Sequence, residues 1–423
     1  MTENIYESGR YRKLRLQTFI TATIGYGLYY VCRLSLNVVK KPIVDNGVLS
    51  ETELGIIGSA LFITYAVGKF VNGFLADRAN IRRFMSAGLF IAGLVNLILG
   101  FTTSSLVFII MWGINGWVQS MGAPAGVVAQ SRWVPDEKRG RYYGIWSASH
   151  NIGEALTFII VAAVVASLGW QWGFRSAGLL GIAGAAALAL LLRNSPQDCG
   201  LPPIEHPSES KSASVWESQK EVLRNPAIWT LAFASAFMYI SRYAVNSWGI
   251  FYLEAERGFS NLEASSIISI SSICGIIGTV ISGFVSDWWF KGSRNAPAVI
   301  FGLMNVCGLG LFLFGPATRA CMIASMVVFG LAIGALICYL GGLMAVDIAP
   351  KNSSGAALGV VGIASYIGAA IQDFVSGLTI ESGKSAAGSY DFSSVSWFWF
   401  GAAVVSVMLT FVVWFMSSRK RMK

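Results

Sequence analysis

The stretch GYGLYYVCR, residues 25–33, places an arginine inside a run that is otherwise free of charge from Leu16 to Val39. An apolar run of this length predicts a membrane-spanning helix. A charged side chain deep in a bilayer costs about 3 kcal/mol on insertion scales, and it usually marks a functional site. The rest of the sequence has to explain Arg33.

The composition is that of a polytopic membrane protein. Of 423 residues, 54% are hydrophobic and only 13% are charged, and the mean hydropathy is +0.60. Hydropathy predicts twelve membrane spans, in two groups of six. Their approximate limits are 14–38, 54–76, 83–101, 104–131, 140–168, 172–193, 225–253, 262–290, 296–315, 319–347, 354–382 and 393–416.

A stretch rich in proline, serine and charge separates the two groups of spans and is typical of a linker. We therefore predict an N-terminal six-helix bundle over residues 1–193, a cytoplasmic interdomain linker over 194–224 and a C-terminal six-helix bundle over 225–423.

The positions of Lys and Arg predict the orientation. If the termini and the linker are cytoplasmic, 22 of the 31 cations fall on that side and six on the opposite side, as the positive-inside rule requires. The net charge of +9 is then mainly a topology signal, with a weak attraction for anionic lipid and no need for nucleic acid. The six cations of the opposite side are Lys40, Lys41, Arg175, Arg257, Arg319 and Lys384.

An internal repeat is also visible. GFLADRANIRR (73–83) follows the second span and GFVSDWWFKGSR (283–294) follows the eighth, so Asp77 and Asp287 are 210 positions apart. The embedded Arg33 and Arg242 are 209 positions apart. Two homologous halves of this kind are the architecture of major facilitator transporters, which bind substrate near the bilayer midplane. The predicted fold class is an all-α membrane protein of twelve transmembrane helices in two pseudo-symmetric six-helix bundles.

Three cations, Arg33, Lys69 and Arg242, lie within predicted spans, whereas only two acids, Glu154 and Asp373, lie as deep. This excess of positive charge predicts an anionic ligand, and arginine suits bidentate recognition of phosphate or carboxylate. The alternative is that each cation pairs with a buried acid, or that Lys69 extends to the membrane surface.

Helical spacing groups further side chains with these cations. Tyr26, Tyr30 and Arg33 share one face of the first span. Trp146, His150 and Glu154 share a face of the fifth span. An imidazole beside a carboxylate can change protonation near neutral pH, which would help to bind a dianion or move a proton. The alternative for His150 is a packing role.

The repeated loop motif predicts a conformational latch formed by Gly73, Asp77, Arg78 and, in the second repeat, Asp287. Gly73 would permit close helix approach, and Asp77 would accept hydrogen bonds from a neighbouring helix N-terminus. The alternative is an ordinary positive-inside turn.

Other chemistry is not indicated. The six cysteines show no CxxC pairing and there are only two histidines, so we expect neither a disulfide framework nor a metal site. We find no nucleotide-binding fingerprint and no hydrolytic constellation, and we expect no enzyme activity and no cofactor. The polar N-terminus, which ends in the basic RYRKLR, does not resemble a cleavable signal peptide.

Several motifs together resemble the organophosphate:phosphate antiporters of the major facilitator superfamily, a group that includes glycerol-3-phosphate carriers, hexose-phosphate carriers and a sugar-phosphate sensor. The resemblance implies exchange of an external organophosphate for internal inorganic phosphate across the bacterial inner membrane, by a monomer. The motifs are GYGLYYVCR, ITYAVGKFVNGFLADRAN, WSASHNIG, NSPQDCGLPPIE, YISRYAVNSW and FKGSRNA.

By position, the resemblance implies that Arg33 and Arg242 hold the phosphoryl group. It implies that His150 and Lys69 assist them. The cavity would be lined by Tyr26, Tyr30 and Tyr366.

Two acids depart from the family pattern. Glu154 stands where the family usually has glycine, and Asp373 stands where the hexose-phosphate carrier has lysine. They could bind a cationic group of a phosphorylated or phosphonate substrate, couple transport to protons, or balance the charge of Lys69 or His150. Two other functions also remain open: a sugar-phosphate sensor with the same fold, and a proton-coupled transporter of another anion such as a carboxylate.

Overall fold

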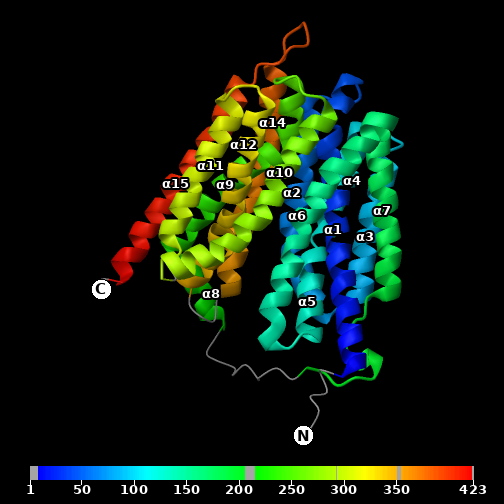
Figure 1. Cartoon of the computed structure of the whole chain (residues 1–423), viewed down its shortest axis with the longest axis vertical. Coiled ribbons are helices and arrows are strands. Elements are labelled where there is room, and N and C mark those ends of the chain that lie inside the picture. Colours follow the sequence, from blue (N-terminus) through cyan, green and yellow to red (C-terminus); the bar gives the residue numbers. More distant parts are fainter. Residues whose placement is uncertain (1–7, 205–214, 292, 350–353, 422–423) are drawn as a thin grey trace. The chain divides into compact units, whose positions relative to one another are not determined.

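A computed structural model describes residues 8–204, 215–291, 293–349 and 354–421, and these residues are almost entirely helical (Figure 1). By their contacts they form two compact units: unit 1 comprises Met1–Val39 and Val67–Ser210, and unit 2 comprises Lys40–Ala66 and Lys211–Lys423. Two long helices, α1 (Gly9–Asp45) and α2 (Glu51–Arg78), contribute residues to both units. The predicted all-α class is confirmed.

Unit 1 holds five further α-helices. The asparagine before α3 caps it, since the Asn80 side chain accepts a hydrogen bond from the backbone N–H of Arg83. A short turn at residues 120–121 divides the predicted fourth span into two helices. The elements are α3 (Ile81–Leu99), α4 (Ser105–Gln119), α5 (Gly122–Trp133), α6 (Asp136–Leu168), α7 (Trp170–Leu191) and the short η2 (Gln197–Cys199).

Unit 2 holds the remaining helices. A capping box between Ser260 and Glu263 starts α10, and π-helical turns follow α10 and α12. The elements are α8 (Val215–Arg224), α9 (Pro226–Ala255), α10 (Asn261–Phe284), η3 (Val285–Trp289), α11 (Asn295–Phe314), α12 (Arg319–Cys338), η4 (Tyr339–Leu343), α13 (Met344–Ile348), α14 (Ser354–Ser382) and α15 (Ser393–Arg421).

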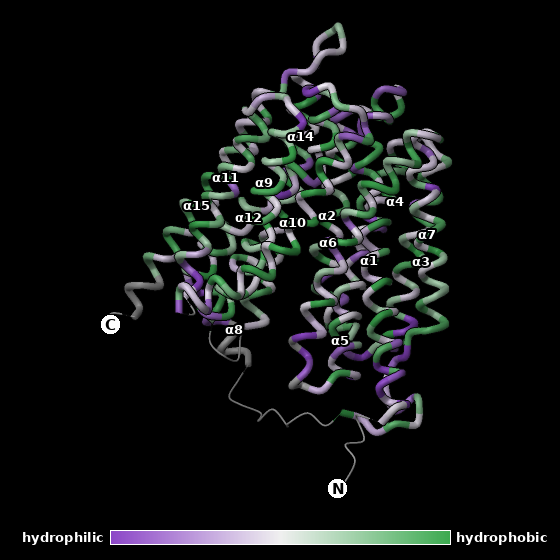
Figure 2. Tube along the Cα trace, in the orientation of Figure 1, coloured by the Kyte–Doolittle hydropathy of each residue, from purple (hydrophilic) through white to green (hydrophobic). Residues whose placement is uncertain are grey.

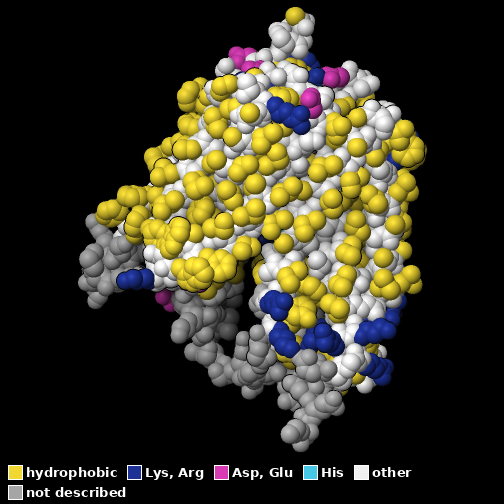
Figure 3. Space-filling model, in the orientation of Figure 1, with side chains coloured by type: hydrophobic (Ala, Val, Ile, Leu, Met, Phe, Trp, Pro, Cys, Tyr) yellow, Lys and Arg dark blue, Asp and Glu magenta, His cyan; other side chains and the backbone are white. Residues whose placement is uncertain are grey.

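Among the described residues, ten helical segments are long and apolar enough to cross a membrane, and each corresponds to a predicted span. The first and seventh predicted spans correspond to α1 and α9, which are 37 and 30 residues long and contain the two embedded arginines. Apolar residues dominate the middle of the helices (Figure 2), and hydrophobic side chains cover the middle of each unit on the face shown in Figure 3. The protein is an integral membrane protein.

Glycines let several helices pack backbone to backbone. In unit 1, a Cβ on Gly93 of α3 would lie 2.9 Å from the carbonyl oxygen of Gly178 on α7. In unit 2, a Cβ on Gly278 of α10 would lie 2.1 Å from the carbonyl oxygen of Leu331 on α12. Small residues at helix crossings are the usual means of close packing in membranes.

Residues 40–66, the end of α1 and the first half of α2, pack with the C-terminal helices. A Cβ on Gly377 of α14 would lie 2.5 Å from the carbonyl oxygen of Glu51 and 2.9 Å from the Cα of Gly55. The sequence-based division placed this segment in the bundle 1–193, so the compact units cut across that boundary. Part of the predicted linker, residues 205–214, lies outside the described residues.

Candidate functional site

Arg33 stands at one end of a row of aromatic rings in unit 1. It is only 4% exposed, and its guanidinium carbon lies 5.6 Å from the ring centroid of Tyr30. Tyr30 meets Tyr26 edge-on at 5.6 Å, and Tyr26 stacks on Trp146 of α6 at 4.7 Å. The negative faces of aromatic rings attract a guanidinium, so this row helps to stabilise a buried cation.

His150 joins the same row. Its ring lies 5.4 Å from that of Tyr30, and its Nδ1 donates a hydrogen bond to the carbonyl oxygen of Ser147. Since a carbonyl only accepts, Nδ1 carries a proton and Nε2 is the nitrogen that can gain or lose one. Glu154, one turn further along α6, is 5% exposed. α1 and α6 thus contact each other through Tyr26 and Tyr30 on α1 and through Trp146 and His150 on α6.

Arg242 has a matching setting in unit 2. It is 8% exposed, and its guanidinium carbon lies 5.6 Å from the ring of Tyr239 and 5.3 Å from that of Tyr243. Tyr366 of α14 lies 5.5 Å from Tyr239, and Tyr65 of α2 lies 4.5 Å from Tyr366. The sequence predicted Tyr366 as a site residue but did not single out Tyr243.

The two arginine settings repeat each other in detail. In each unit an arginine follows a tyrosine by three residues, is more than nine-tenths buried, and holds its guanidinium 5.6 Å from that tyrosine ring. Tyr30 and Tyr239 are 209 positions apart, as are Arg33 and Arg242. The internal repeat predicted from the sequence therefore extends to the side-chain arrangement.

Asp373 is fully enclosed in unit 2, with a lysine as its charge partner. The Asp373 carboxylate lies 3.6 Å from Lys40 Nζ and accepts hydrogen bonds from Ser247 Oγ at 2.6 Å and Trp248 Nε1 at 2.7 Å. Lys40 also donates to Ser247 Oγ at 2.9 Å and lies 3.8 Å from the Trp248 ring centroid. Lys40 is 0% exposed and Asp373 is 1% exposed.

This partner was missed by the sequence analysis, which counted Lys40 among the cations of the opposite face and considered Lys69 or His150 as balancing charges. The predicted first span ended at residue 38, whereas α1 continues to Asp45. Lys40 therefore lies on the last part of α1, which belongs to unit 2. Ser247 and Trp248 were not predicted to contact Asp373.

Lys69, on the part of α2 that belongs to unit 1, is exposed, in contrast to the two arginines. The structure therefore gives Lys69 a different environment from Arg33. Its role as an assisting residue remains a prediction.

The predicted latch residues lie at helix ends. A Cβ added to Gly73 would meet no atom within 4 Å, so close helix approach, the reason given for this glycine, does not occur here. Asp77 and Arg78 are exposed, and the backbone carbonyl of Asp77 accepts a hydrogen bond from Arg132 Nη2 at 3.0 Å. Asp287 lies in the π-helical turn η3.

Arg132 ties the end of α2 to the chain beyond α7. Its Nη1 donates to the carbonyl of Ala79 at 3.2 Å and to Asn194 Oδ1 at 2.7 Å. An open cavity of about 510 Å³ is lined here by Arg78, Arg132 and Asn194, among others. The sequence indicated Arg132 only as a topology determinant.

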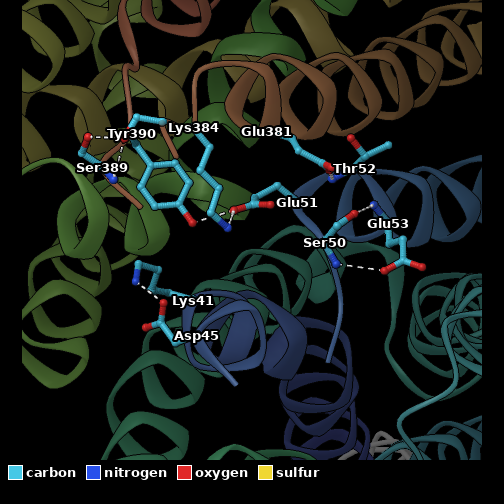
Figure 4. Close-up of polar contacts among 11 residues, drawn as sticks. Lys41, Asp45, Ser50, Glu51, Thr52, Glu53, Glu381, Lys384, Ser389 and Tyr390 are labelled. Carbon is cyan, nitrogen blue, oxygen red and sulfur yellow. Dashed lines mark hydrogen bonds and ion pairs between the residues drawn. The ribbon is translucent and has the colours of Figure 1, made fainter. Parts of the chain in front are cut away.

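A polar cluster joins the start of α2 to the segment after α14 in unit 2 (Figure 4). The buried carboxylate of Glu51 accepts hydrogen bonds from Lys384 Nζ at 2.9 Å and from the Tyr390 hydroxyl at 2.5 Å. The backbone N–H of Thr52 donates to Glu381 Oε2 at 2.8 Å. This cluster fixes the segment 40–66 within unit 2.

The helical units and their repeated arginine settings define a membrane transporter of the major facilitator type. The sequence model of the Major Facilitator Superfamily matches residues 22–372, and the chain belongs to this family.

Among relatives, the chain is 34% identical over 388 residues to the membrane sensor protein UhpC of Salmonella typhimurium, covering 88% of this chain and 86% of the relative. It is 34% identical over 392 residues to the glycerol-3-phosphate transporter of Bacillus subtilis (88% and 87%), and 32% identical over 395 residues to a probable hexose phosphate transport protein of Chlamydia muridarum (86% and 85%). The resemblance to the organophosphate:phosphate antiporters is confirmed.

Solved structures agree on the fold. A bacterial homologue of the human lysosomal transporter Spinster, in an inward-facing and occupied conformation, matches with a TM-score of 0.76 at 18% identity, covering 97% of this chain and 98% of that one. The nucleoside transporter NupG matches with a TM-score of 0.75 at 15% identity, covering 95% and 99%.

Proposed function

We propose that this protein transports a small organophosphate, such as a glycerol phosphate, a sugar phosphate or a phosphonate, into the cell in exchange for inorganic phosphate. The observation that carries the proposal is the pair of buried arginines, each set against tyrosine rings in its own unit. The relatives named as transporters of phosphorylated compounds support the same substrate class.

Each guanidinium offers a planar fork of N–H donors that fits two oxygens of a phosphoryl group. An anion held by one arginine of each repeat would compensate the cost of keeping both cations away from water. Transport then follows by rocker-switch alternating access, with no covalent step.

The neighbouring residues have supporting roles in this proposal. Tyr26, Tyr30 and Tyr366 shape the site around the arginines, and Lys69 and His150 add charge for a dianionic substrate. Gly73, Asp77, Arg78 and Asp287 form the proposed latch.

For Asp373, the contact with Lys40 favours charge balance over recognition of a substrate cation or proton coupling. For Glu154 all three roles stay in the proposal: recognition of a substrate cation, proton coupling and charge balance.

The proposed location is the bacterial inner membrane, with both termini in the cytoplasm and a monomeric chain surrounded by lipid. The distribution of Lys and Arg along the sequence supports this orientation. Lys and Arg side chains also gather at the N-terminal end of unit 1 (Figure 3).

The second candidate function is that of a sensor, since one relative at 34% identity is named a membrane sensor protein. Phosphate counterflow in proteoliposomes distinguishes the two. Vesicles loaded with unlabelled phosphate should accumulate labelled phosphate if the protein is an exchanger, and unlabelled organophosphate outside should inhibit this uptake. A protein that binds organophosphate but shows no counterflow would be a sensor, and indifference to millimolar phosphate would favour a carboxylate transporter.

A further inference from the structure

A small cavity lies inside unit 1, where α1, α5 and α6 meet. Arg15 and Thr18 of α1, Gln130 of α5 and Trp146 of α6 are among the residues that line it. The volume that the centre of a water-sized sphere can occupy in this cavity is about 10 Å³. This is about what a single water molecule needs.

Three polar atoms at this cavity have no hydrogen-bond partner among the described residues: Thr18 Oγ1, Gln130 Oε1 and Trp146 Nε1. Thr18 is 1% exposed, and Gln130 and Trp146 are each 4% exposed. Buried polar atoms are satisfied in more than nine cases in ten, often by an ordered water. Three such atoms from three helices at one cavity point to a common ligand.

The donors and acceptors at the cavity match a water molecule. Gln130 Nε2 donates to the carbonyl oxygen of Gly126 at 3.3 Å, which leaves Oε1 as an acceptor. The indole N–H of Trp146 can only donate, and the hydroxyl of Thr18 can do either. Water accepts from the indole and donates to the amide oxygen. A chloride ion would be attracted by the Arg15 guanidinium but repelled by the Gln130 amide oxygen, which needs a donor. A metal cation would face the indole N–H and the Arg15 guanidinium.

We propose that one ordered water molecule binds here and cross-links α1, α5 and α6 through Thr18, Gln130 and Trp146. The water fixes the plane of the indole on which Tyr26 stacks at 4.7 Å, with 18° between the rings. It thereby anchors the row of rings that ends at Arg33. The inference concerns the fold of unit 1 and stands apart from the proposed transport activity.

A crystal structure of the full chain, at a resolution that shows ordered water, tests the proposal directly. Density should lie within hydrogen-bond distance of the three polar atoms and should disappear in Trp146→Phe. A dry cavity would overturn the proposal. So would an anomalous peak at this position after a bromide soak, because that would identify an anion.

A double-mutant cycle gives an independent test. If one water molecule bonds both side chains, Gln130→Met and Trp146→Phe should each lower the melting temperature. The decrease in the double variant should then be clearly smaller than the sum of the two single decreases. Additive shifts would contradict a shared water. The control pairs Gln130→Met with Trp399→Phe in unit 2, whose indole bonds Ser376 Oγ at 2.8 Å, and this pair should be additive.

If a variant of Gln130 or Trp146 does not fold, Thr18 supplies a milder comparison. Thr18→Ser keeps the hydroxyl and should keep the water density, whereas Thr18→Val should lose or displace it. Identical density in the valine and serine variants would remove Thr18 from the proposed site.

Discussion

Arg33 and Arg242 are buried cations, and each lies against a tyrosine ring. Each guanidinium lies over a tyrosine ring one turn earlier in its own helix. Such a contact is worth roughly 0.5–2 kcal/mol. That is below the cost of about 3 kcal/mol or more for a cation at mid-bilayer, so the ring alone does not offset it. Part of the cost is therefore left for other contacts or for a ligand.

The buried pair of Lys40 and Asp373 gives a prediction at the same scale. Lys40→Met leaves the buried carboxylate of Asp373 without its cation, and Asp373→Asn leaves the buried ammonium of Lys40 without its anion. Each single variant should therefore destabilise the protein by about 3–5 kcal/mol. The double variant should recover most of that loss. Thermal unfolding in detergent measures all three.

The neighbouring pair Lys41 and Asp45 is the matched control, since Asp45 is half exposed and Lys41→Met should cost less than about 1 kcal/mol. An Asp373→Asn variant that stays stable but changes the substrate preference or the pH dependence of transport would contradict the charge-balance role and restore the alternatives.

The sequence indicated that Arg33 and Arg242 are buried cations but did not indicate the burial of Lys40, for one physical reason. A charge in the middle of a long apolar run is conspicuous, whereas a lysine two residues beyond the end of the predicted span resembles an interfacial residue. Only the packing of residues 40–66 in unit 2 shows that Lys40 is buried.

At the scale of elements, the crossing of α2 and α14 depends on the absence of a side chain at Gly58. A Cβ there would lie 1.9 Å from Asp373 Oδ2, and the carboxylate is held by Lys40, Ser247 and Trp248. Gly58→Ala should therefore destabilise the protein by about 1–3 kcal/mol, as overpacking does.

The control for Gly58→Ala lies in the same helix. Gly73 has open space around it, so Gly73→Ala should be neutral or stabilising by up to about 1 kcal/mol, because alanine is the better helix former. Melting temperatures of the two variants provide the comparison. Equal effects would mean that the close crossing at Gly58 does not exist in the folded protein.

The end of α9 carries a pH-sensitive group just beyond the predicted seventh span. Burial raises the pKa of Glu254 from 4.5 to about 8, while a hydrogen bond from Asn261 and the charge of Lys41 oppose the shift and Asp45 adds to it. Between these pH values the folded state binds a proton that the unfolded state lacks. The free energy of unfolding should therefore fall as the pH rises from about 5 to 8.

Glu254→Gln removes the carboxyl group that takes up this proton. The melting temperature of the variant should therefore depend less on pH between pH 5 and 8, and it should exceed that of the wild type above pH 8. Parallel curves for the two proteins would show that Glu254 titrates normally. Asp391→Asn, at an exposed acid whose pKa is lowered by hydrogen bonds to Ser393, is the control and should leave the slope between pH 5 and 8 unchanged.

Sequence periodicity predicted the helices well because a membrane span imposes both length and apolar composition. It could not predict the π-helical turns η3 and η4, which depend on local packing such as the hydrogen bond from the Tyr339 hydroxyl to the Ser282 carbonyl. The sequence analysis also assigned residues 40–66 to the N-terminal bundle, together with the residues on either side of them in the chain. Glycine contacts between α2 and α14 associate them with unit 2 instead.

At the scale of the whole molecule, each of two homologous repeats contains one buried arginine, and the proposed function requires both arginines to bind an anion. Family membership and fold follow from the sequence and the comparisons. The identity of the substrate depends on the side chains around the arginines. Transport and sensing share this fold, so only function in a sealed membrane separates them.

Binding of labelled inorganic phosphate to the purified chain, compared between the wild type and two arginine variants, tests the central claim most directly. Lysine keeps the charge but loses the second of the two parallel hydrogen bonds that a guanidinium can make to an anion. A hydrogen bond to a charged group contributes about 1.5–3 kcal/mol. Arg33→Lys and Arg242→Lys should therefore each weaken binding roughly tenfold to a hundredfold. Arg257→Lys, whose guanidinium also lies over a tyrosine ring in unit 2, should leave the affinity unchanged. Unaltered phosphate affinity in both Arg33→Lys and Arg242→Lys would contradict the account.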